Sequence, residues 1–235
     1  MGMMTKKIVA IIPARGGSKA LARKNIKNIA GKPLIAWTIQ AALNSKYITK
    51  TVVSSEDDEI LKISQKNGAD VIKRPEELAS DTATSESVVL HALDFLSSYK
   101  EEFDIVVLLQ PSSPLRTSKD IDNAFELMFD DKATAVISVY EADNKILKAF
   151  KYGESGYFEG ISNIDFSFMR RQDLPKIFMP NGAIYIVTKN AFTKYNSFAT
   201  SRTSCYIMPI KFSIDIDSEG DLKLAEKRLL SISAS

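Results

Sequence analysis

The sequence contains one cysteine, Cys205, and one histidine, His91, among its 235 residues. A lone cysteine excludes a disulfide within the chain, and the two residues together cannot form a metal cluster of thiolate and imidazole ligands. A metal bound by a single chain must therefore be a hard cation with oxygen ligands, such as Mg²⁺. The lack of a second histidine and of a G-x-S-x-G motif disfavours a hydrolase triad. We interpret His91 as a structural helix residue and Cys205 as a small core residue.

Long apolar runs and a surplus of one charge are also missing. No apolar run reaches the roughly 18 residues of a membrane-spanning helix, and no signal peptide precedes the apolar segment that starts at Ile8. Lys and Arg total 31 against 29 Asp and Glu, which gives a formal net charge of +2. This balance disfavours a nucleic-acid-binding surface but is compatible with a basic pocket for a small polyanion. We expect a soluble, cytoplasmic protein with neither nucleic acid nor membrane as a partner.

Apolar segments of strand length alternate with amphipathic segments of helix length along most of the chain. We expect strands at residues 8–12, 51–54, 71–72, 105–109, 135–139 and 183–187, and helices at residues 34–43, 57–67, 85–99, 118–129 and from Ser218 onward. Nearly continuous apolar strands separated by helices indicate a mostly parallel sheet that is covered on both faces. The sequence therefore predicts an α/β fold with a doubly wound, mostly parallel sheet in one domain, residues 1–235.

The alternation stops between residues 141 and 180, where the chain is polar and contains three glycines and scattered aromatic residues. This segment is too long for a simple loop within a compact domain. The residues leave three interpretations open: an inserted hairpin subdomain, an arm that binds a partner, or a disordered stretch.

The first segment that suggests chemistry follows the first expected strand and contains Gly16 and Gly17. A glycine pair lets the backbone approach a ligand and point its N–H groups at it. Positive charges surround the pair at Arg15, Lys19, Arg23 and Lys24. Backbone donors and cations together suit a triphosphate. The segment matches neither the P-loop nor the G-x-G-x-x-G pattern, and the competing interpretation is a solvated basic turn.

Three further polar segments lie next to expected strands. Arg74 precedes a run of hydroxyl residues in which Thr84 or Ser85 can cap a helix, so capping alone explains that run. Gln110 and Arg116 flank a turn stiffened by two prolines, for which a plain turn is an equal alternative. Asn181 precedes a glycine at the start of the last expected strand, where a turn is the simplest explanation.

Asp215 and Asp217 form a pair just before the last expected helix. Residues two apart in an extended segment face the same side, so both carboxylates project together. Two carboxylates on one side suit Mg²⁺ that also bridges phosphate oxygens. Helix capping by Asp217 or Ser218 is the alternative, but it leaves Asp215 unexplained.

Five motifs occur in one order along the chain: residues 14–19 with Lys24 and Asn25, residues 74–79, residues 108–116, residues 180–185 and residues 215–217. In this combination the chain resembles the acylneuraminate cytidylyltransferases, or CMP-sialic acid synthetases, from Ile8 to the final helix. The resemblance implies a fold like that of the nucleotide-diphospho-sugar transferases. It also implies transfer of CMP from CTP to the anomeric hydroxyl of a sialic-acid-type sugar, with release of pyrophosphate.

The resemblance also assigns roles to individual residues. It implies nucleotide contacts for Arg15, Ser18, Lys19, Lys24, Asn25, Arg74 and Ser85. It implies sugar contacts for Gln110, Arg171, Asn181 and Tyr185, and binding of Mg²⁺ (or Mn²⁺) by Asp215 and Asp217. Arg15 and Lys19 would serve catalysis by neutralising charge on the phosphates, and Asp215 and Asp217 would do so through the metal that they hold.

The irregular segment gains an interpretation from the same resemblance. Family members resemble homodimers in which this excursion, residues 141–180, reaches the partner's active site, and Lys148 matches the residue that crosses over. We therefore expect a homodimer, which is also the commonest oligomer.

Two departures from the family pattern bear on the sugar and the loop. Ala20 stands where a further glycine is common, and Met179 stands where some family members carry arginine. The acceptor is expected to be a nine-carbon 2-keto-3-deoxy sugar acid, with N-acetylneuraminate first and legionaminic acid second. Another nonulosonate, the eight-carbon acid Kdo, or a regulator that binds nucleotide without catalysis are the remaining alternatives.

Overall fold

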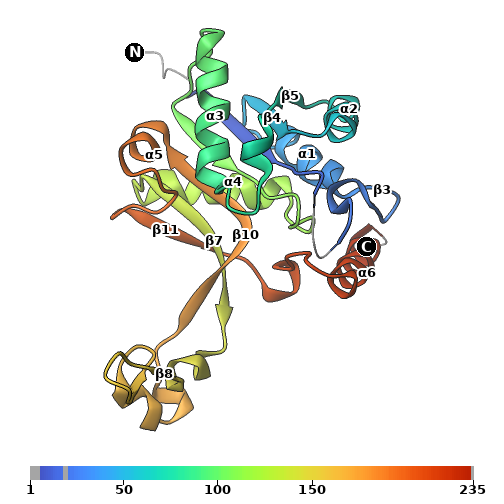
Figure 1. Ribbon diagram of the computed structural model, residues 1–235. Coiled ribbons are helices and arrows are strands. Elements are labelled where there is room, and N and C mark those ends of the chain that lie inside the picture. The colour runs from blue at the N-terminus through green and yellow to red at the C-terminus, as the bar shows by residue number, and fades with distance from the viewer. Residues whose placement is uncertain (1–5, 18–20, 234–235) are drawn as a thin grey trace.

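A computed structural model describes residues 6–17 and 21–233, and it contains a seven-stranded sheet with helices on both faces (Figure 1). The strand order is β11-β7-β10-β6-β1-β4-β5. The strands of this sheet are β1 (Ile8–Pro13), β4 (Lys50–Ser55), β5 (Asp70–Lys73), β6 (Ile105–Leu108), β7 (Ala135–Ala142), β10 (Ile177–Thr188) and β11 (Thr203–Ile207). The helices are α1 (Leu34–Leu43), α2 (Asp58–Lys66), α3 (Ser85–Ser98), α4 (Ser118–Asp130), α5 (Lys189–Tyr195) and α6 (Glu219–Ser233).

Alternate residues of β1 face opposite layers of the core. Ile8, Ala10 and Ile12 pack with buried side chains of α1, α2 and α4. Val9 and Ile11 pack with buried side chains of α3 and α5 on the other face. The predicted doubly wound sheet covered on both faces is therefore confirmed.

One strand of the sheet runs against the others. β10 is antiparallel to both β6 and β7, whereas the β1–β4, β1–β6, β4–β5 and β7–β11 pairs are parallel. The beginning of β10, and not its end, therefore lies at the edge where the parallel strands finish. Pairing between β10 and β7 shifts at this point, because Pro180 faces Val139 but Tyr185 faces Ile137. The bulge holds residues 181–184, including Gly182 at φ +74.

Residues beyond the bulge form a stalk and an arm. The outer parts of β7 and β10 pair from Ile177 with Ala142 to Pro180 with Val139, and they carry a small unit away from the sheet (Figure 1). The arm contains a two-stranded sheet of β8 (Phe150–Tyr152) and β9 (Phe158–Gly160). It also contains the short 3₁₀ helices Asn144–Lys148, Ile164–Phe168 and Arg171–Asp173. The use of this segment for dimerisation stays a prediction.

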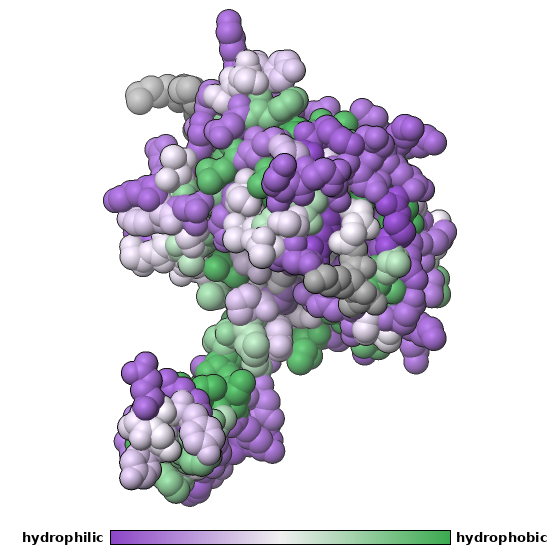
Figure 2. All heavy atoms as spheres, in the orientation of Figure 1, coloured by the Kyte–Doolittle hydropathy of each residue, from purple (hydrophilic) through white to green (hydrophobic). Residues whose placement is uncertain are grey.

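Many large apolar side chains of the arm lie at its surface. Tyr152, Tyr157 and Phe168 are 74%, 78% and 81% exposed. Hydrophobic residues are also visible on the stalk and where the stalk meets the arm (Figure 2). A protein surface with this many exposed aromatic side chains is typical of an interaction site.

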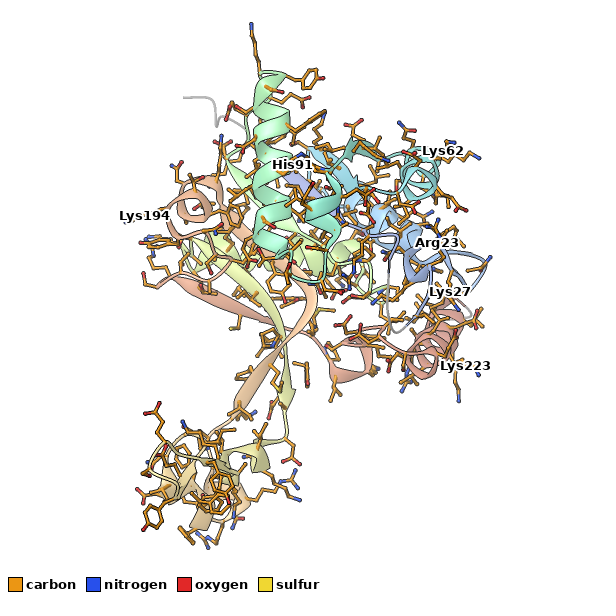
Figure 3. All side chains as sticks on the ribbon, viewed as in Figure 1. Arg23, Lys27, Lys62, His91, Lys194 and Lys223 are labelled. Carbon is orange, nitrogen blue, oxygen red and sulfur yellow. The ribbon has the colours of Figure 1, made fainter. Side chains whose placement is uncertain are left out.

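Two elements and one residue differ from the sequence-based expectation. α5 and β11 fall between residues 188 and 207, where the sequence predicts no element; α5 has only seven residues, and β11 is an edge strand of five residues. Cys205 lies in β11 and is exposed, so its interpretation as a core residue is wrong. At an edge strand, side chains on the uncovered side stay in contact with solvent. His91 lies within α3 as expected (Figure 3).

Two small features complete the fold. A hairpin of β2 (Asn28–Ile29) and β3 (Lys32–Pro33) precedes α1, and the 3₁₀ helices Lys24–Ile26, Glu76–Ala79 and Ile210–Phe212 lie in connecting segments. Within residues 6–17 and 21–233, no helix has both the length and the apolar character needed to cross a membrane.

Candidate functional site

A pocket of about 350 Å³ lies at the edge where β1 and β6 end. In open α/β sheets this edge is the usual position of a ligand site. Predicted site residues from four separate segments line it: Arg15, Lys24, Asn25, Arg74, Ser85, Gln110, Asp215 and Asp217. The fold thus brings together side chains that are separated by as much as two hundred residues of chain.

The loop after β1 is fixed by buried hydrogen bonds. Ala14 N donates to Ser54 O at 3.0 Å, and the amide of the buried Asn25 donates to Arg15 O at 2.9 Å. Gly16 is required here, because a Cβ atom at this position would lie 2.4 Å from a carboxylate oxygen of Asp57. The remaining predicted residues of this loop, Ser18 and Lys19, lie outside the described residues, as does Ala20.

The two cations that follow the loop have different surroundings. Arg23 forms ion pairs with Asp57 and Glu59 at the start of α2 (Figure 3), and it is not among the pocket residues. Lys24 lines the pocket, and its ammonium group donates to Ile216 O at 2.6 Å and to Asp217 Oδ1 at 3.1 Å. Of these two, Lys24 is the residue placed to meet a ligand.

Glu56 is a site residue that the sequence did not single out. Its Oε1 accepts the Gly16 N–H at 2.6 Å, and its Oε2 accepts from Arg74 Nη2 at 2.9 Å and Nε at 3.2 Å. The side chains of Arg74 and Glu56 are 3% and 9% exposed. Burial lowers the pKa of Arg74, and the neighbouring carboxylate of Glu56 opposes this effect. Glu56 therefore joins the glycine loop to the arginine across the pocket wall.

The position of Glu56 after a predicted strand suggests a ligand site, but helix capping explains the same stretch of sequence. Glu56 comes directly after β4, at the sheet edge where ligand-binding groups gather. It also stands in an acidic run at the start of α2, where Asp57 is the N-cap and accepts from Glu59 N and Ile60 N. Helix capping accounts for such a run, and a buried partner at Arg74 is not visible in local sequence.

The start of α3 settles which residue caps that helix. Thr84 is the N-cap, and its hydroxyl accepts from Ser87 N at 3.2 Å. Ser85 is the first helical residue and lines the pocket. Thr84 is thus the cap, and the contact of Ser85 with a nucleotide stays a prediction.

The two aspartates near the C-terminus point toward the pocket from an anchored segment. Ile216 between them is fully buried, and Ile216 N donates to Ser112 O at 2.9 Å. Asp215 and Asp217 are exposed and both line the pocket. The alternation of exposed and buried residues confirms that the two carboxylates share one side.

Helix capping before α6 does not involve Asp217 as the capping side chain. Ser218 Oγ accepts from Asp221 N at 3.3 Å, and Asp221 Oδ2 accepts from Ser218 N at 2.8 Å. This reciprocal arrangement is a capping box. The carboxylate of Asp217 is instead directed to Lys24.

The carboxylate pair is compatible with a hard divalent cation. Within residues 6–17 and 21–233, no cluster of three or more His, Cys, Asp or Glu side chains is placed to hold a metal. Two carboxylates leave most positions of a six-coordinate Mg²⁺ to water and to ligand oxygens, which is how Mg²⁺ usually binds beside phosphates. The donor set therefore fits a divalent cation that completes its coordination with water and with oxygens of a bound ligand.

Gln110 lies where the turn after β6 approaches the β10 bulge. A Cβ atom on Gly182 would lie 2.6 Å from Gln110 Oε1 and 3.7 Å from Asp215 Oδ2, so both side chains lie close to the bulge. The φ of +74 at Gly182 favours glycine at this position. Arg116 connects this turn to the bulge. Its Nη2 donates to Gln110 O and its Nε donates to Ala183 O, each at 3.0 Å. Complete burial lowers the pKa of Arg116 to about 10, so it stays charged at neutral pH.

The other residues that are predicted to contact the sugar lie in three different environments. Tyr185 is half-buried, and burial together with the nearby charge of Asp215 raises the pKa of its hydroxyl. Asn181 is 4% exposed and hydrogen-bonded to protein groups. Lys148 and Arg171 lie on the arm, and Arg171 pairs with Asp143 at 3.4 Å. The arm residues do not line this pocket, and their roles stay predictions.

Comparisons with known proteins add to this geometry. The chain matches the family model described as cytidylyltransferase over residues 9–231. It is 38% identical over 226 residues to an N-acylneuraminate cytidylyltransferase of Escherichia coli, an alignment that covers 94% of this chain and 52% of that protein. It is 33% identical over 221 residues to a pseudaminic acid cytidylyltransferase of Campylobacter jejuni, covering 94% of this chain and 95% of that protein. The chain spans about half the length of the N-acylneuraminate relatives from E. coli and Streptococcus agalactiae.

Two solved structures share the fold. The CMP:2-keto-3-deoxy-manno-octonic acid synthetase complexed with CTP has a TM-score of 0.71 at 18% identity, covering 96% of this chain and 99% of that one. The 4-diphosphocytidyl-2C-methyl-D-erythritol synthase of Anaerococcus prevotii has a TM-score of 0.66 at 15% identity, with the same coverage. At these identities the likeness establishes the fold.

The buried ion pair between Arg74 and Glu56 leads us to predict an effect on stability. Glu56→Gln should lower the free energy of unfolding by about 3 kcal/mol, because Arg74 would stay buried without a counter-charge. An amide also has one acceptor oxygen where a carboxylate has two, so Gly16 N and Arg74 could not both be satisfied. Urea denaturation at neutral pH measures the change. Glu59→Gln, which removes an exposed ion pair with Arg23, is the control and should cost less than about 1 kcal/mol; equal losses would contradict the structural role of Glu56.

Proposed function

The chain belongs to the cytidylyltransferase family, and we propose that it transfers CMP from CTP to the anomeric hydroxyl of a sialic-acid-type sugar. One observation carries the proposal: a single pocket combines the cations Arg15, Lys24 and Arg74 with the carboxylates Asp215 and Asp217. A triphosphate and its divalent cation need both sets of groups in one place. The enzyme is thus a nucleotidyltransferase in this proposal.

The proposed reaction is a displacement at the α-phosphorus of CTP. A bond forms between the anomeric oxygen and the α-phosphorus, the bond to the bridging oxygen of the β-phosphate breaks, and pyrophosphate leaves. The hydroxyl loses its proton as the new bond forms, and this proton is released to the solvent. Arg15, with Lys19 from the adjoining part of the loop, neutralises charge on the phosphates, which lowers the barrier for such transfers.

The remaining pocket residues bind and orient the nucleotide. Lys24 and Asn25, which follow the first loop, line the pocket together with Arg74 and Ser85. Asp215 and Asp217 would hold Mg²⁺ or Mn²⁺, which would supply additional neutralisation of the phosphates. Lys24 pairs with Asp217 at 3.1 Å, so this carboxylate would exchange one cation for another when metal binds.

N-acetylneuraminate is the proposed acceptor. Gln110 lies beside Gly182 and Asp215, and its amide offers both a donor and an acceptor to the acylamino group of such a sugar. Arg171 would pair with the sugar carboxylate. The E. coli relative, named N-acylneuraminate cytidylyltransferase, supports this choice.

Pseudaminic acid is the second candidate. The C. jejuni relative named for that acid matches over nearly its full length, 95%, whereas the chain covers 52% of the E. coli relative. Legionaminic acid keeps the amide that Gln110 would recognise, and Met179, which is 42% exposed, would tolerate its less polar substituents. Kdo has no amide and ranks last.

A homodimer completes the proposal. Lys148 and Arg171 lie on the arm and do not line the pocket of their own chain. The exposed aromatic side chains of the arm provide a surface for a second copy. In such a dimer Lys148 and Arg171 would reach the sugar in the partner's pocket.

A pyrophosphate assay tests the function directly. CTP is offered with N-acetylneuraminate, pseudaminic acid, legionaminic acid or Kdo in the presence of Mg²⁺. Asp217→Asn should lower turnover at least about 100-fold without unfolding the protein, because a metal-binding charge is lost. Glu219→Gln is the control, since Glu219 is a nearby exposed carboxylate paired with Lys27 and not a pocket residue. CTP binding without pyrophosphate release from any sugar would favour a non-catalytic regulator.

A second prediction concerns the choice of sugar. Wild-type kcat/KM should be at least about tenfold higher for N-acetylneuraminate than for Kdo, because a site built to hydrogen-bond a substituent rejects an analogue without it. Gln110→Ala should narrow this ratio, mainly by lowering kcat/KM for the acylated sugar. Equal values for the two sugars in the wild type would show that Gln110 does not recognise the acyl group.

Mixed dimers test the role of the arm. Lys148→Ala should reduce turnover at least about tenfold and leave CTP binding unchanged, because the lysine serves the partner's sugar site in this proposal. Co-expression of Lys148→Ala with Asp217→Asn should restore activity, since one of the two pockets then has both wild-type groups. A fully active monomer at assay concentration would contradict the dimer.

A further inference from the structure

The side chain of Asn181 uses its full hydrogen-bonding capacity on other protein groups. An amide side chain has two acceptor positions on oxygen and two N–H donors. Its Oδ1 accepts from Ser138 Oγ at 2.6 Å and from Ala183 N at 3.1 Å. Its Nδ2 donates to Ser213 Oγ at 2.9 Å and to Met208 Sδ at 3.2 Å. With 4% of the residue exposed, no position is left for a ligand unless one of these bonds breaks.

These bonds join separate parts of the chain at one point. Ser138 belongs to β7 and is fully buried, and Ala183 belongs to the bulge of β10. Ser213 stands two residues before Asp215, in the segment that leads from Met208 to the carboxylate pair. The main-chain oxygen of Asn181 also accepts from Ser113 Oγ, in the turn after Gln110, at 3.4 Å. Asn181 thus connects the sheet to both sides of the pocket.

The residue that follows Asn181 shows how close these sides are. Around Gly182, a Cβ atom would meet Gln110 Oε1 at 2.6 Å, Ser113 Oγ at 3.5 Å and Asp215 Oδ2 at 3.7 Å. A small displacement of the bulge would therefore change the separation of Gln110 and Asp215. The amide of Asn181 links this bulge to both Ser138 and Ser213. Ile184 N also donates to Ser138 Oγ at 2.7 Å, but only the amide of Asn181 among these groups bonds to Ser213.

We propose that Asn181 is a positioning residue that sets the placement of the Asp215–Asp217 carboxylates through Ser213, and does not itself contact the sugar. The proposal rests on the proposed cytidylyltransferase function for its kinetic consequences. It differs from the role that family resemblance implies, in which Asn181 lines the sugar site. The two roles predict different phenotypes, because a lost sugar contact raises KM for the sugar, whereas a misplaced carboxylate pair weakens metal binding.

Hydrogen exchange in the metal-free protein provides a measurement that does not depend on activity. The Ile216 amide, which donates to Ser112 O at 2.9 Å, reports the order of the carboxylate segment. Ser213→Ala should raise its exchange rate about tenfold, because the link to Asn181 is lost and the segment opens more often. Asn181→Ala should raise it at least as much. Ser204→Ala is the control, since that hydroxyl bonds to Asp131 on the far side of β11 and should have no effect.

Kinetics of the same variants separate the two roles. Ser213→Ala and Asn181→Ala should each raise the Mg²⁺ concentration for half-maximal activity about fivefold or more, with KM for the sugar within about twofold of wild type. The double variant should be no worse than Asn181→Ala alone, because both changes remove one connection. If Asn181→Ala does not fold, Ser213→Ala decides by itself.

The opposite pattern would overturn the inference. Ser213→Ala with wild-type exchange and wild-type Mg²⁺ dependence would show that the link positions nothing. A raised sugar KM in Asn181→Ala, with unchanged exchange at Ile216, would assign Asn181 to the sugar. A wild-type protein that releases no pyrophosphate would contradict the proposed function, and the exchange comparison would still decide the inference.

Discussion

Strand β10 runs antiparallel to both β6 and β7 and hydrogen-bonds to each of them. Because of this direction, the chain enters the sheet at the same edge where β1 and β6 leave it. The β10 bulge therefore stands next to the turn that carries Gln110 and next to the segment that carries Asp215. A parallel strand in this place would put residues 181–184 at the opposite edge, away from Gln110 and Asp215.

Each pocket cation in the described part of the chain already has a carboxylate partner. Arg15 pairs with Asp81 at 2.9 Å, Arg74 with Glu56 at 2.9 Å and Lys24 with Asp217 at 3.1 Å. The pocket lining also contains the carboxylates Asp81, Asp215 and Asp217, so its cations and carboxylates are balanced, as they nearly are in the whole chain. An anionic ligand has to replace the exposed partners of Arg15 and Lys24, whereas the Arg74–Glu56 pair is buried and acts as part of the wall. The Arg74–Glu56 pair thus differs from the Arg15–Asp81 and Lys24–Asp217 pairs in its burial and not in the kinds of residue that form it.

The sequence was sufficient where the signal is local. Apolar runs such as residues 105–109 predict strands because both faces of the sheet are covered, and the alternation around Ile216 predicts the paired carboxylates. Local sequence does not predict contacts between residues that are far apart in the chain. Glu56 and Arg74 are 18 residues apart, and only the parallel register of β4 and β5 makes them neighbours. The exposure of Cys205 likewise depends on β11 being an edge strand, which its own residues do not specify.

The bulge in β10 divides the pairing between β10 and β7 into two parts, each with its own register. Outside it, Pro180 faces Val139; inside it, Tyr185 faces Ile137, so residues 181–184 absorb the difference. An insertion or deletion in the arm changes only the outer ladder, because the inner one is anchored against both β6 and β7. The arm can therefore diverge in length and composition during evolution while the pocket is inherited unchanged. Changes in the arm would then leave Gln110 and Asp215 in place beside the bulge.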